Sequence, residues 1–425
     1  MRFVWRILKI FSKFASRIIA TYPENALIIS IMRIRNLIHV SSRIAKYALM
    51  LTLCLGITMH ALRSYALYDI NLDMQMQAAR VAVVLPFKSQ QIEGIRSLEF
   101  YRGMLLAAED AKKSGHTIQI AAFNEENPDV DITPTIEKAV AQSDIMVGFY
   151  YRNHAIVAGN YCENAGKLAA FPMSSFIPVD LKNNRSSLFT ATTTKQFVEK
   201  YAKIATSTFG KCNIIYAHSQ EALKSSETEE FVFEMKNLGC KVHYISIDAA
   251  ASQIKKKLAT NRQNVVVTNS NDKNELNGLL LRVMSLCQTT SDCKIAVLGN
   301  SQWAAFCVSP NVFANNDVYV PILSNPNVNL PAAQVLRTRY REAFHCDALE
   351  RTPSDLLDGY DFGMLLFDGL SKYGTSFMLY PSTSPYVVNA YSFCNPNNGC
   401  WTNENVRLLH YTTDGLQYLL EFKNK

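Results

Sequence analysis

The chain has 425 residues, enough for two or three domains, and a formal net charge of +7. Residues 1–66 hold ten of the Lys and Arg residues and a single acid, Glu24. The remainder holds 33 basic and 35 acidic residues, so the body of the protein is nearly neutral. A neutral body lacks the basic surface that phosphate contacts need, which argues against nucleic acid as a partner.

The first 66 residues are typical of a targeting segment. A mostly apolar run of 12 residues, ALMLTLCLGITM at 48–59, follows several basic residues and precedes Ser64-Tyr65-Ala66. This order predicts a secretory signal peptide cleaved after Ala66, and the run is shorter than the roughly 20 residues of a membrane-spanning helix. Because this leader is long, we expect either that translation starts at Met32, making 1–31 an over-extension, or that a basic amphipathic leader lies on the membrane surface.

After a short linker at 67–78, strand and helix patterns alternate along the chain. In the first half, the sequence predicts strands at 81–87, 117–123, 144–151, 167–173 and 187–193, and helices at 98–113, 133–142 and 154–165. The pattern then restarts, with helices at 196–208, 221–238, 252–260 and 272–287, and strands at 212–218, 240–246, 264–270 and 293–299. Helices at 332–344 and 360–372 follow, and from about 386 the pattern indicates an antiparallel ribbon.

Repeated strand–helix units predict parallel sheets with helices on both faces. The continuous apolar run VAVVLPF at 81–87 supports this, because such runs are typical of strands buried on both sides. Two series of units predict an α/β fold of two doubly wound parallel-sheet lobes. We assign 79–192 plus about 320–385 to lobe one, and 193–319 plus about 386–425 to lobe two.

Motifs of nucleotide-binding and hydrolytic enzymes are absent. The first strand is followed by FKSQQIEGIRS, whose one glycine, Gly94, does not make a dinucleotide fingerprint. Neither a phosphate-binding P-loop nor a GxSxG nucleophile elbow occurs, and the eight histidines are not spaced as metal ligands. We therefore predict no catalytic residue, no metal and no cofactor, and a protein that is not an enzyme.

Ten cysteines suggest disulfides if the protein is exported. Cys287 and Cys293, and likewise Cys394 and Cys400, lie six residues apart in polar, turn-rich segments. We favour a disulfide within each pair over zinc binding, because no CxxC motif occurs. Two further pairings stay open on the sequence alone: Cys212 with Cys240, and Cys307 with Cys346.

Several segments together resemble a known superfamily. They are VAVVLPF followed by EFYRGMLLAAEDAKKSGHTIQIAAFNEEN, then DIMVGFYY, KLAAFPMSS, CKIAVLGNSQW and LRTRYREAFHCDALERTPSDLLDGYDFGMLLFDGLSKYG. From about Ala79 onward, the chain resembles the type I periplasmic-binding-protein superfamily, which includes receptors for branched-chain amino acids. The sequence of these segments is most similar to a Bacteroidota branch of the superfamily. In that branch the domain often follows peptidoglycan-binding LysM repeats, although this chain has no visible LysM repeat.

The resemblance implies two lobes, joined by hinge crossovers, that close over a ligand at the carboxyl ends of both sheets. It implies a periplasmic protein that binds a small polar ligand, such as an amino acid or peptide fragment, for transport or sensing. An ABC permease or cell-envelope proteins would be its partners. The alternative is an envelope- or peptidoglycan-associated module that binds partner proteins without a small ligand, as in outer-membrane lipoprotein activators of penicillin-binding proteins.

The residues that follow the strands are the candidate ligand contacts. Hydroxyls, amides and aromatic rings suit a neutral polar or zwitterionic ligand. The resemblance places Ser174 and Ser175 where amino-acid receptors bind a carboxylate, and Arg152 could pair with a carboxylate bidentately. The sequence shows no clear acidic partner for an ammonium near Gln302. The candidates are Phe87, Ser89, Tyr150, Arg152, Ser174 and Ser175 in lobe one, and Ser219, Asn269, Gln302 and Trp303 in lobe two.

Overall fold

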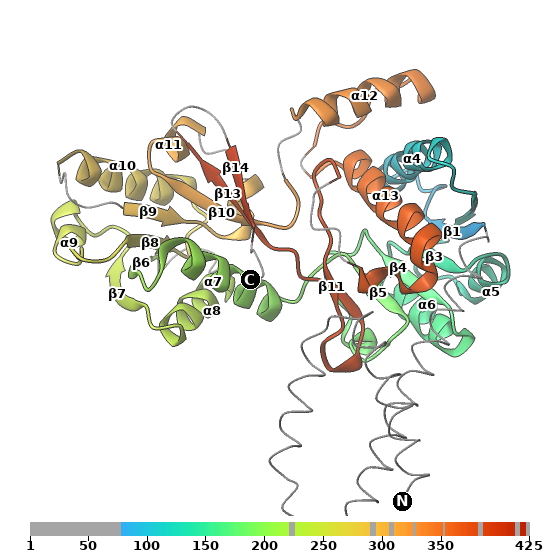
Figure 1. Ribbon diagram of the computed structural model, residues 1–425, viewed down its shortest axis with the longest axis horizontal. Coiled ribbons are helices and arrows are strands. Elements are labelled where there is room, and N and C mark those ends of the chain that lie inside the picture. The colour runs from blue at the N-terminus through green and yellow to red at the C-terminus, as the bar shows by residue number, and fades with distance from the viewer. Residues whose placement is uncertain are drawn as a thin grey trace, which may run out of the picture. The chain divides into compact units, whose positions relative to one another are not determined.

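The computed structural model describes residues 78–220, 226–289, 295–305, 310–325, 329–351, 353–380, 386–412 and 417–421. The predicted leader at 1–66, and the predicted linker except for Ala78, lie outside these ranges. Two seven-stranded sheets with helices against them form the two lobes, so the predicted two-lobed α/β fold is confirmed (Figure 1).

The first sheet is parallel except at one edge and has the strand order β11-β12-β5-β4-β3-β1-β2. Only β11 runs antiparallel to its neighbour, β12. Side chains of β1 alternate between two cores: Val81, Val83 and Leu85 pack with α4 and α13, whereas Ala82 and Val84 pack with α5 and α6. The elements are β1 (Ala79–Leu85), α4 (Ile92–Lys113), β2 (Ile118–Asn124), α5 (Thr133–Gln142), β3 (Ile145–Gly148), α6 (Arg152–Ala165), β4 (Leu168–Phe171), β5 (Ser187–Phe189), α12 (Pro331–Phe344), α13 (Asp355–Tyr373), β11 (Phe393–Cys394) and β12 (Trp401–Asn403).

The second sheet has the order β14-β13-β10-β9-β8-β6-β7, and its β13 pairs antiparallel with both β10 and β14. Residues of α10 and α11 cover one face, and residues of α7 and α8 cover the other. The elements are α7 (Thr194–Phe209), β6 (Asn213–His218), α8 (Ser226–Asn237), β7 (Lys241–Ser246), α9 (Ala251–Lys255), β8 (Asn264–Thr268), α10 (Lys273–Thr289), β9 (Ile295–Leu298), α11 (Pro310–Ala314), β10 (Val318–Ile322), β13 (Arg407–Tyr411) and β14 (Gln417–Glu421). Short 3-10 turns lie at 179–181, 301–305, 374–379 and 396–398.

Some predicted elements differ from the structure at their ends. The strand expected at 144–151 stops at Gly148, because Gly148 and Phe149 both have positive φ, of 130° and 62°, which turns the chain. The two helices that pack on β1 begin earlier than predicted, α4 at Ile92 and α13 at Asp355. Strand β10 was not expected, and it contains Pro321.

The chain passes between the two sheets three times. It crosses between β5 and α7, returns between β10 and α12, and crosses again between β12 and β13. This membership differs from the expected boundaries at about 320 and 386. Strand β10 belongs to the second sheet, whereas β11 and β12 pair within the first sheet.

Two buried charged residues hold the segment around Val388, which lies between α13 and β11. Asp361 of α13 accepts hydrogen bonds from the backbone N–H groups of Val387, Val388 and Asn389, at 2.9, 2.8 and 2.7 Å. Arg407 of β13 donates to the carbonyl oxygen of Val388 at 2.8 Å and to that of Leu323 at 2.9 Å. This segment is therefore bound by α13 of the first lobe and by β13 of the second.

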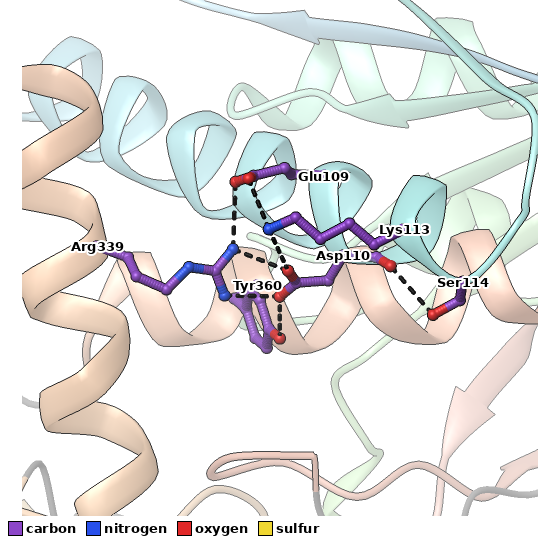
Figure 2. Close-up of polar contacts among 6 residues, drawn as sticks. All are labelled: Glu109, Asp110, Lys113, Ser114, Arg339 and Tyr360. Carbon is purple, nitrogen blue, oxygen red and sulfur yellow. Dashed lines mark hydrogen bonds and ion pairs between the residues drawn. The ribbon is translucent and has the colours of Figure 1, made fainter.

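Helices α4, α12 and α13 form one packed group on the first lobe. Helices α4 and α13 approach so closely that a Cβ at Gly359 would collide with the carbonyl of Phe100. Figure 2 shows how α12 is attached: Arg339 reaches Asp110 at 2.6 Å and Glu109 at 3.2 Å on α4. Tyr360 of α13 donates to the same Asp110 at 2.8 Å. Among the described helices, none is both long and apolar enough to cross a membrane.

Candidate ligand-binding site

The candidate residues follow strands that are neighbours in their sheets. In the first sheet they follow β1, β3 and β4, which lie side by side, and in the second they follow β6, β8 and β9. These strands run parallel, so the ends that carry the candidates meet at one edge of each sheet. This is the edge at which open α/β sheets bind ligands.

After β1, the candidate Ser89 is held by the helix that follows. Its hydroxyl donates to Glu93 at 2.9 Å, and Glu93 lies in the first turn of α4. The candidate Phe87 is half-buried and packs edge-on against Tyr101 of α4, with ring centroids 5.2 Å apart. Ser89 therefore lies at the polar edge, whereas Phe87 packs against the core below it.

After β3, a buried Glu–His contact shapes the loop that carries Tyr150. Glu125 accepts hydrogen bonds from the backbone N–H groups of Tyr150 and Tyr151, at 2.7 and 3.2 Å. It also lies 3.1 Å from Nδ1 of His154, whose Nε2 faces the carbonyl oxygen of Val130. Burial raises the pKa of Glu125, while the bond to His154 opposes that rise. The pair fixes the direction in which the two tyrosines leave the strand.

The Tyr150 hydroxyl lies beside an ion pair. Arg96 of α4 donates to Tyr150 at 3.4 Å and is bound by both carboxylate oxygens of Asp355, the first residue of α13. Arg351 also contacts Asp355, at 3.2 Å. Because Asp355 holds Arg96 at two oxygens, this guanidinium serves first to join α4 to α13.

Exposed candidates gather around the exit of β4, where Arg152 reaches over from the first turn of α6. Arg152 has 56 % of its side chain exposed, lies over the ring of Phe176 at 5.6 Å and is 4.0 Å from Asp180. Ser174 donates to the carbonyl oxygen of Phe176 at 2.6 Å, whereas Ser175 is exposed. Arg152 thus keeps most of its guanidinium accessible to a ligand.

In the second lobe, the exits of β6 and β8 are joined through one carboxylate. Ser219 donates to Glu275 at 2.8 Å, and Ser270 donates to the other oxygen of the same Glu275. The candidate Asn269 accepts from the backbone N–H of Ser219 at 2.9 Å. Ser219 and Asn269 are both buried, so they support the edge of the sheet from beneath its surface.

The exit of β9 presents amides and a second carboxylate. Asn271 donates to the exposed candidate Gln302 at 2.8 Å. Next to Gln302, the hydroxyl and the N–H of Ser301 donate to Glu227 at 2.6 and 2.9 Å. Burial raises the pKa of Glu227, and the bonds from Ser301 oppose that rise. An acidic group therefore does lie near Gln302, which the sequence did not reveal.

Trp303 does not lie at this edge. Its indole is fully buried in the core of the second lobe and stacks on Phe313, with ring centroids 5.7 Å apart. In this structure it is a core residue, in contrast to the predicted ligand contact. The 3-10 turn at 301–305 explains the difference, because it leaves Gln302 exposed and turns the next side chain inward.

Three carboxylates that sequence reasoning missed have one feature in common. Glu93, Glu227 and Glu275 each lie in the first turn of the helix that follows a candidate strand, and each accepts a serine hydroxyl. An acid in the first turn was visible in the sequence, but it is common for another reason: acids there stabilise the helix dipole.

The described residues contain no group of three His, Cys, Asp or Glu side chains that could hold a metal ion. The disulfide predicted between Cys394 and Cys400 is not formed, and both carry free thiols. Cys394 instead accepts a hydrogen bond from Gln196 at 3.0 Å, and Cys400 packs in the core beside α6. The predicted partner of Cys287, Cys293, and the open partner of Cys346, Cys307, lie outside the described residues.

No protein-family model matches the sequence, and no curated protein matches it. Solved structures do share the fold. A putative branched-chain amino acid ABC transporter protein from Rhodospirillum rubrum has a TM-score of 0.55 and 13% identity, covering 81% of this chain and 100% of that one. LpoA from Haemophilus influenzae has a TM-score of 0.54 and 14% identity, covering 82% of this chain.

An ABC transporter substrate-binding protein from Desulfitobacterium hafniense is also similar, with a TM-score of 0.47 and 14% identity over 81% of this chain and 100% of that one. The chain matches 59% of the length of LpoA. At these identities the likeness shows the fold alone. This shared fold is a two-lobed α/β fold, as the sequence predicted.

Proposed function

We propose that this chain is an exported, non-enzymatic receptor that closes its two lobes over a small polar ligand, such as an amino acid or peptide fragment, for transport or sensing. One observation carries the proposal. In each sheet, polar groups from three neighbouring strand exits gather at the carboxyl edge, where carboxylates in the first helical turns hold serine hydroxyls in place.

The hydrogen bonds favour a particular ligand chemistry. The protons of Ser219 and Ser270 go to Glu275, and that of Ser301 goes to Glu227, so these hydroxyls can only accept from a ligand. Two carboxylates and hydroxyl acceptors favour a ligand with N–H donors, above all an ammonium group. The exposed Arg152 in lobe one favours a carboxylate. Both preferences together fit an amino acid or a short peptide.

A second function has an observation in its favour. Ser219 and Asn269 are buried, and the Asn269 side chain bonds to the backbone N–H and carbonyl of Ser219, so this part of the edge offers few hydrogen-bonding groups to a ligand. The fold is also as similar to LpoA as to the transporter protein of Rhodospirillum rubrum. This favours an envelope- or peptidoglycan-associated module that binds partner proteins without a small ligand. An ABC permease would be the partner of the receptor, and cell-envelope proteins those of the module.

A thermal-shift screen of the full chain against amino acids, small peptides and muropeptides tests the receptor. A ligand that binds only the folded state stabilises it by about 2.7 kcal/mol at a hundredfold excess over its Kd. We expect Glu227→Gln and Arg152→Gln to abolish the shift. Their matched controls, the exposed helical residues in Glu342→Gln and Arg341→Gln, should leave it unchanged.

The outcomes separate the two functions. A saturable shift that only the edge variants lose supports the receptor and identifies its ligand class. A saturable shift that survives both edge variants contradicts the assignment of the site to these edges. If no compound shifts the midpoint, the receptor proposal fails, and crosslinking of the chain in the cell envelope then tests the partner-binding module.

A further inference from the structure

Two cysteines of the second lobe lie opposite each other where neighbouring strands begin. Cys212 immediately precedes β6, Cys240 immediately precedes β7, and the parallel register pairs Asn213 with Lys241. The preceding residues are therefore also opposite. Neighbouring strands lie about 4.8 Å apart, and a disulfide joins Cα atoms that are about 4.4–6.8 Å apart. The backbone of the sheet thus places these two cysteines within disulfide range.

The side chains already point at each other. The two Sγ atoms are 3.5 Å apart, in contact but not bonded, and both thiols are buried in the core that α7 and α8 form with the sheet. A backbone hydrogen bond from Lys241 to the carbonyl of Cys212, at 3.2 Å, holds the two strand starts together. The two sulfurs must approach each other by about 1.5 Å to reach the length of a disulfide bond.

The surroundings favour thiolate formation at one of the two sulfurs. The hydrogen bond from the Cys212 thiol and the positive charges of Arg262 and Lys211 lower the pKa of Cys240, although burial opposes this. The thiolate is the species that attacks a disulfide. By contrast, burial raises the pKa of Cys162, the buried cysteine of α6, to about 12.

We propose that Cys212 and Cys240 are the site of a reversible intrachain disulfide that ties β7 to β6. The oxidant is a disulfide, either of a small molecule such as oxidised glutathione or of an oxidising protein outside the cytoplasm. The Cys240 thiolate attacks one sulfur of the oxidant and expels the other as a thiolate. Cys212 then loses its proton, attacks the Cys240 sulfur and expels the second thiolate.

Atoms and electrons balance in this thiol–disulfide exchange. The two cysteines lose two protons and two electrons, and the oxidant's disulfide becomes two thiols. The disulfide would tie down an edge strand, because β7 is the last strand of the described second sheet and its neighbour there is β6. It would also close the loop that contains α8. Closing such a loop stabilises the folded state mainly by restricting the unfolded chain.

Peptide mapping of the full chain tests the site directly. The protein is incubated with oxidised glutathione or with dithiothreitol, unfolded, alkylated with N-ethylmaleimide and digested with trypsin. After oxidation we expect the peptide CNIIYAHSQEALK, which begins at Cys212, to be linked to NLGCK, which contains Cys240. If both cysteines are alkylated after oxidation, or if either is linked to another cysteine, the proposal is wrong.

Thermal unfolding gives a second readout. The oxidised wild type should unfold roughly 5–10 °C higher than the reduced one, and this difference should disappear in Cys212→Ser and Cys240→Ser. The control Cys162→Ala removes a buried thiol of the other lobe and should keep the difference. Equal midpoints for oxidised and reduced wild type would overturn the proposed tie. The peptide map needs no variant, so it decides even if a cysteine variant fails to fold.

Discussion

Asp361 and Arg407 bind the same residue, Val388, from opposite ends of its backbone. Asp361 accepts its N–H at 2.8 Å, and Arg407 donates to its carbonyl oxygen at 2.8 Å. The two side chains come from different lobes, and both are fully buried. The charges do not meet each other, because the backbone of Val388 lies between their contacts.

The variant Asp361→Asn should destabilise the protein strongly. The side-chain amide can accept at only one oxygen, so at least one of the three buried N–H groups near Val388 loses its acceptor. We expect the free energy of unfolding in urea to fall by about 2–4 kcal/mol. The control Asp347→Asn changes an exposed ion pair with Arg341 and should cost under about 0.5 kcal/mol. Equal losses in the two variants would show that Asp361 does not hold the segment around Val388.

Glu99 of α4 should make the stability depend on pH. Burial raises its pKa to about 7, while the N–H of Leu349, at 2.6 Å, and the charges of Arg337 and Arg351 oppose the rise and Asp355 adds to it. The folded state therefore holds a proton that the unfolded state has lost between about pH 4.5 and 7. Over this window the contribution of Glu99 to stability decreases as the pH rises.

The variant Glu99→Gln isolates this effect, because glutamine cannot titrate. The free energy of unfolding of the variant, minus that of the wild type, should be larger at pH 8 than at pH 5, by up to about 3 kcal/mol. Urea unfolding at both pH values measures it. The exposed Glu342→Gln should show a constant difference. A constant difference for Glu99→Gln as well would mean that Glu99 is ionised at both pH values.

Two arginines of α12 allow a matched comparison. Arg339 binds Asp110 and Glu109 on α4 with 27 % of its side chain exposed, whereas Arg341 pairs with Asp347 at 66 % exposure. Although burial of Asp110 opposes it, the bonds from Arg339 and Tyr360 lower the pKa of that carboxyl. Urea unfolding should show a loss of about 1–2 kcal/mol for Arg339→Ala and under about 0.5 kcal/mol for Arg341→Ala. The reverse order would mean that the contacts in Figure 2 do not attach α12.

Two glycines of the second lobe should respond to alanine with opposite signs. A Cβ at Gly299, just after β9, would collide with the ring of the buried Trp303, so Gly299→Ala should lower the free energy of unfolding by about 1–3 kcal/mol. A Cβ at Gly278, inside α10, would meet only the end of the Arg282 side chain, 3.3 Å away. Gly278→Ala should therefore stabilise by about 0.5–1 kcal/mol. Thermal unfolding of both variants checks the pair, and a stable Gly299→Ala would show that Trp303 can shift.

The sequence predicted the fold well wherever the local pattern decides the structure. Buried strands such as 213–218 and 264–268 are apolar runs that end in polar residues, so their positions and exits were readable. The sequence did not reveal to which sheet the strands near residue 400 belong. Strand β12 pairs with β5, more than 200 residues earlier in the chain, and no local pattern reports such a partner. The predicted boundary near 386 was misplaced for this reason.

The candidate site shows the same division. Gln302 and Arg152 are exposed as expected, because they follow strand ends in turns and first helical turns. Trp303, one residue after Gln302, is buried instead of exposed. The 3-10 turn that buries it has no distinctive sequence signal. Glu227 and Glu275 were invisible as site residues, because their partners Ser301 and Ser219 lie 74 and 56 residues away.

The three passages of the chain between its sheets bear on how the protein folds during synthesis. The first sheet needs β12 at 401–403 to cover β5, and the second needs β13 at 407–411 to cover β10. A growing chain therefore leaves an open strand edge in each lobe until residues 401–411 have been made. Contacts between residues so distant along the chain form slowly, and exposed edges attract aggregation or chaperones. The first lobe must wait for residues 401–403, and the second for residues 407–411, before it can reach its final form.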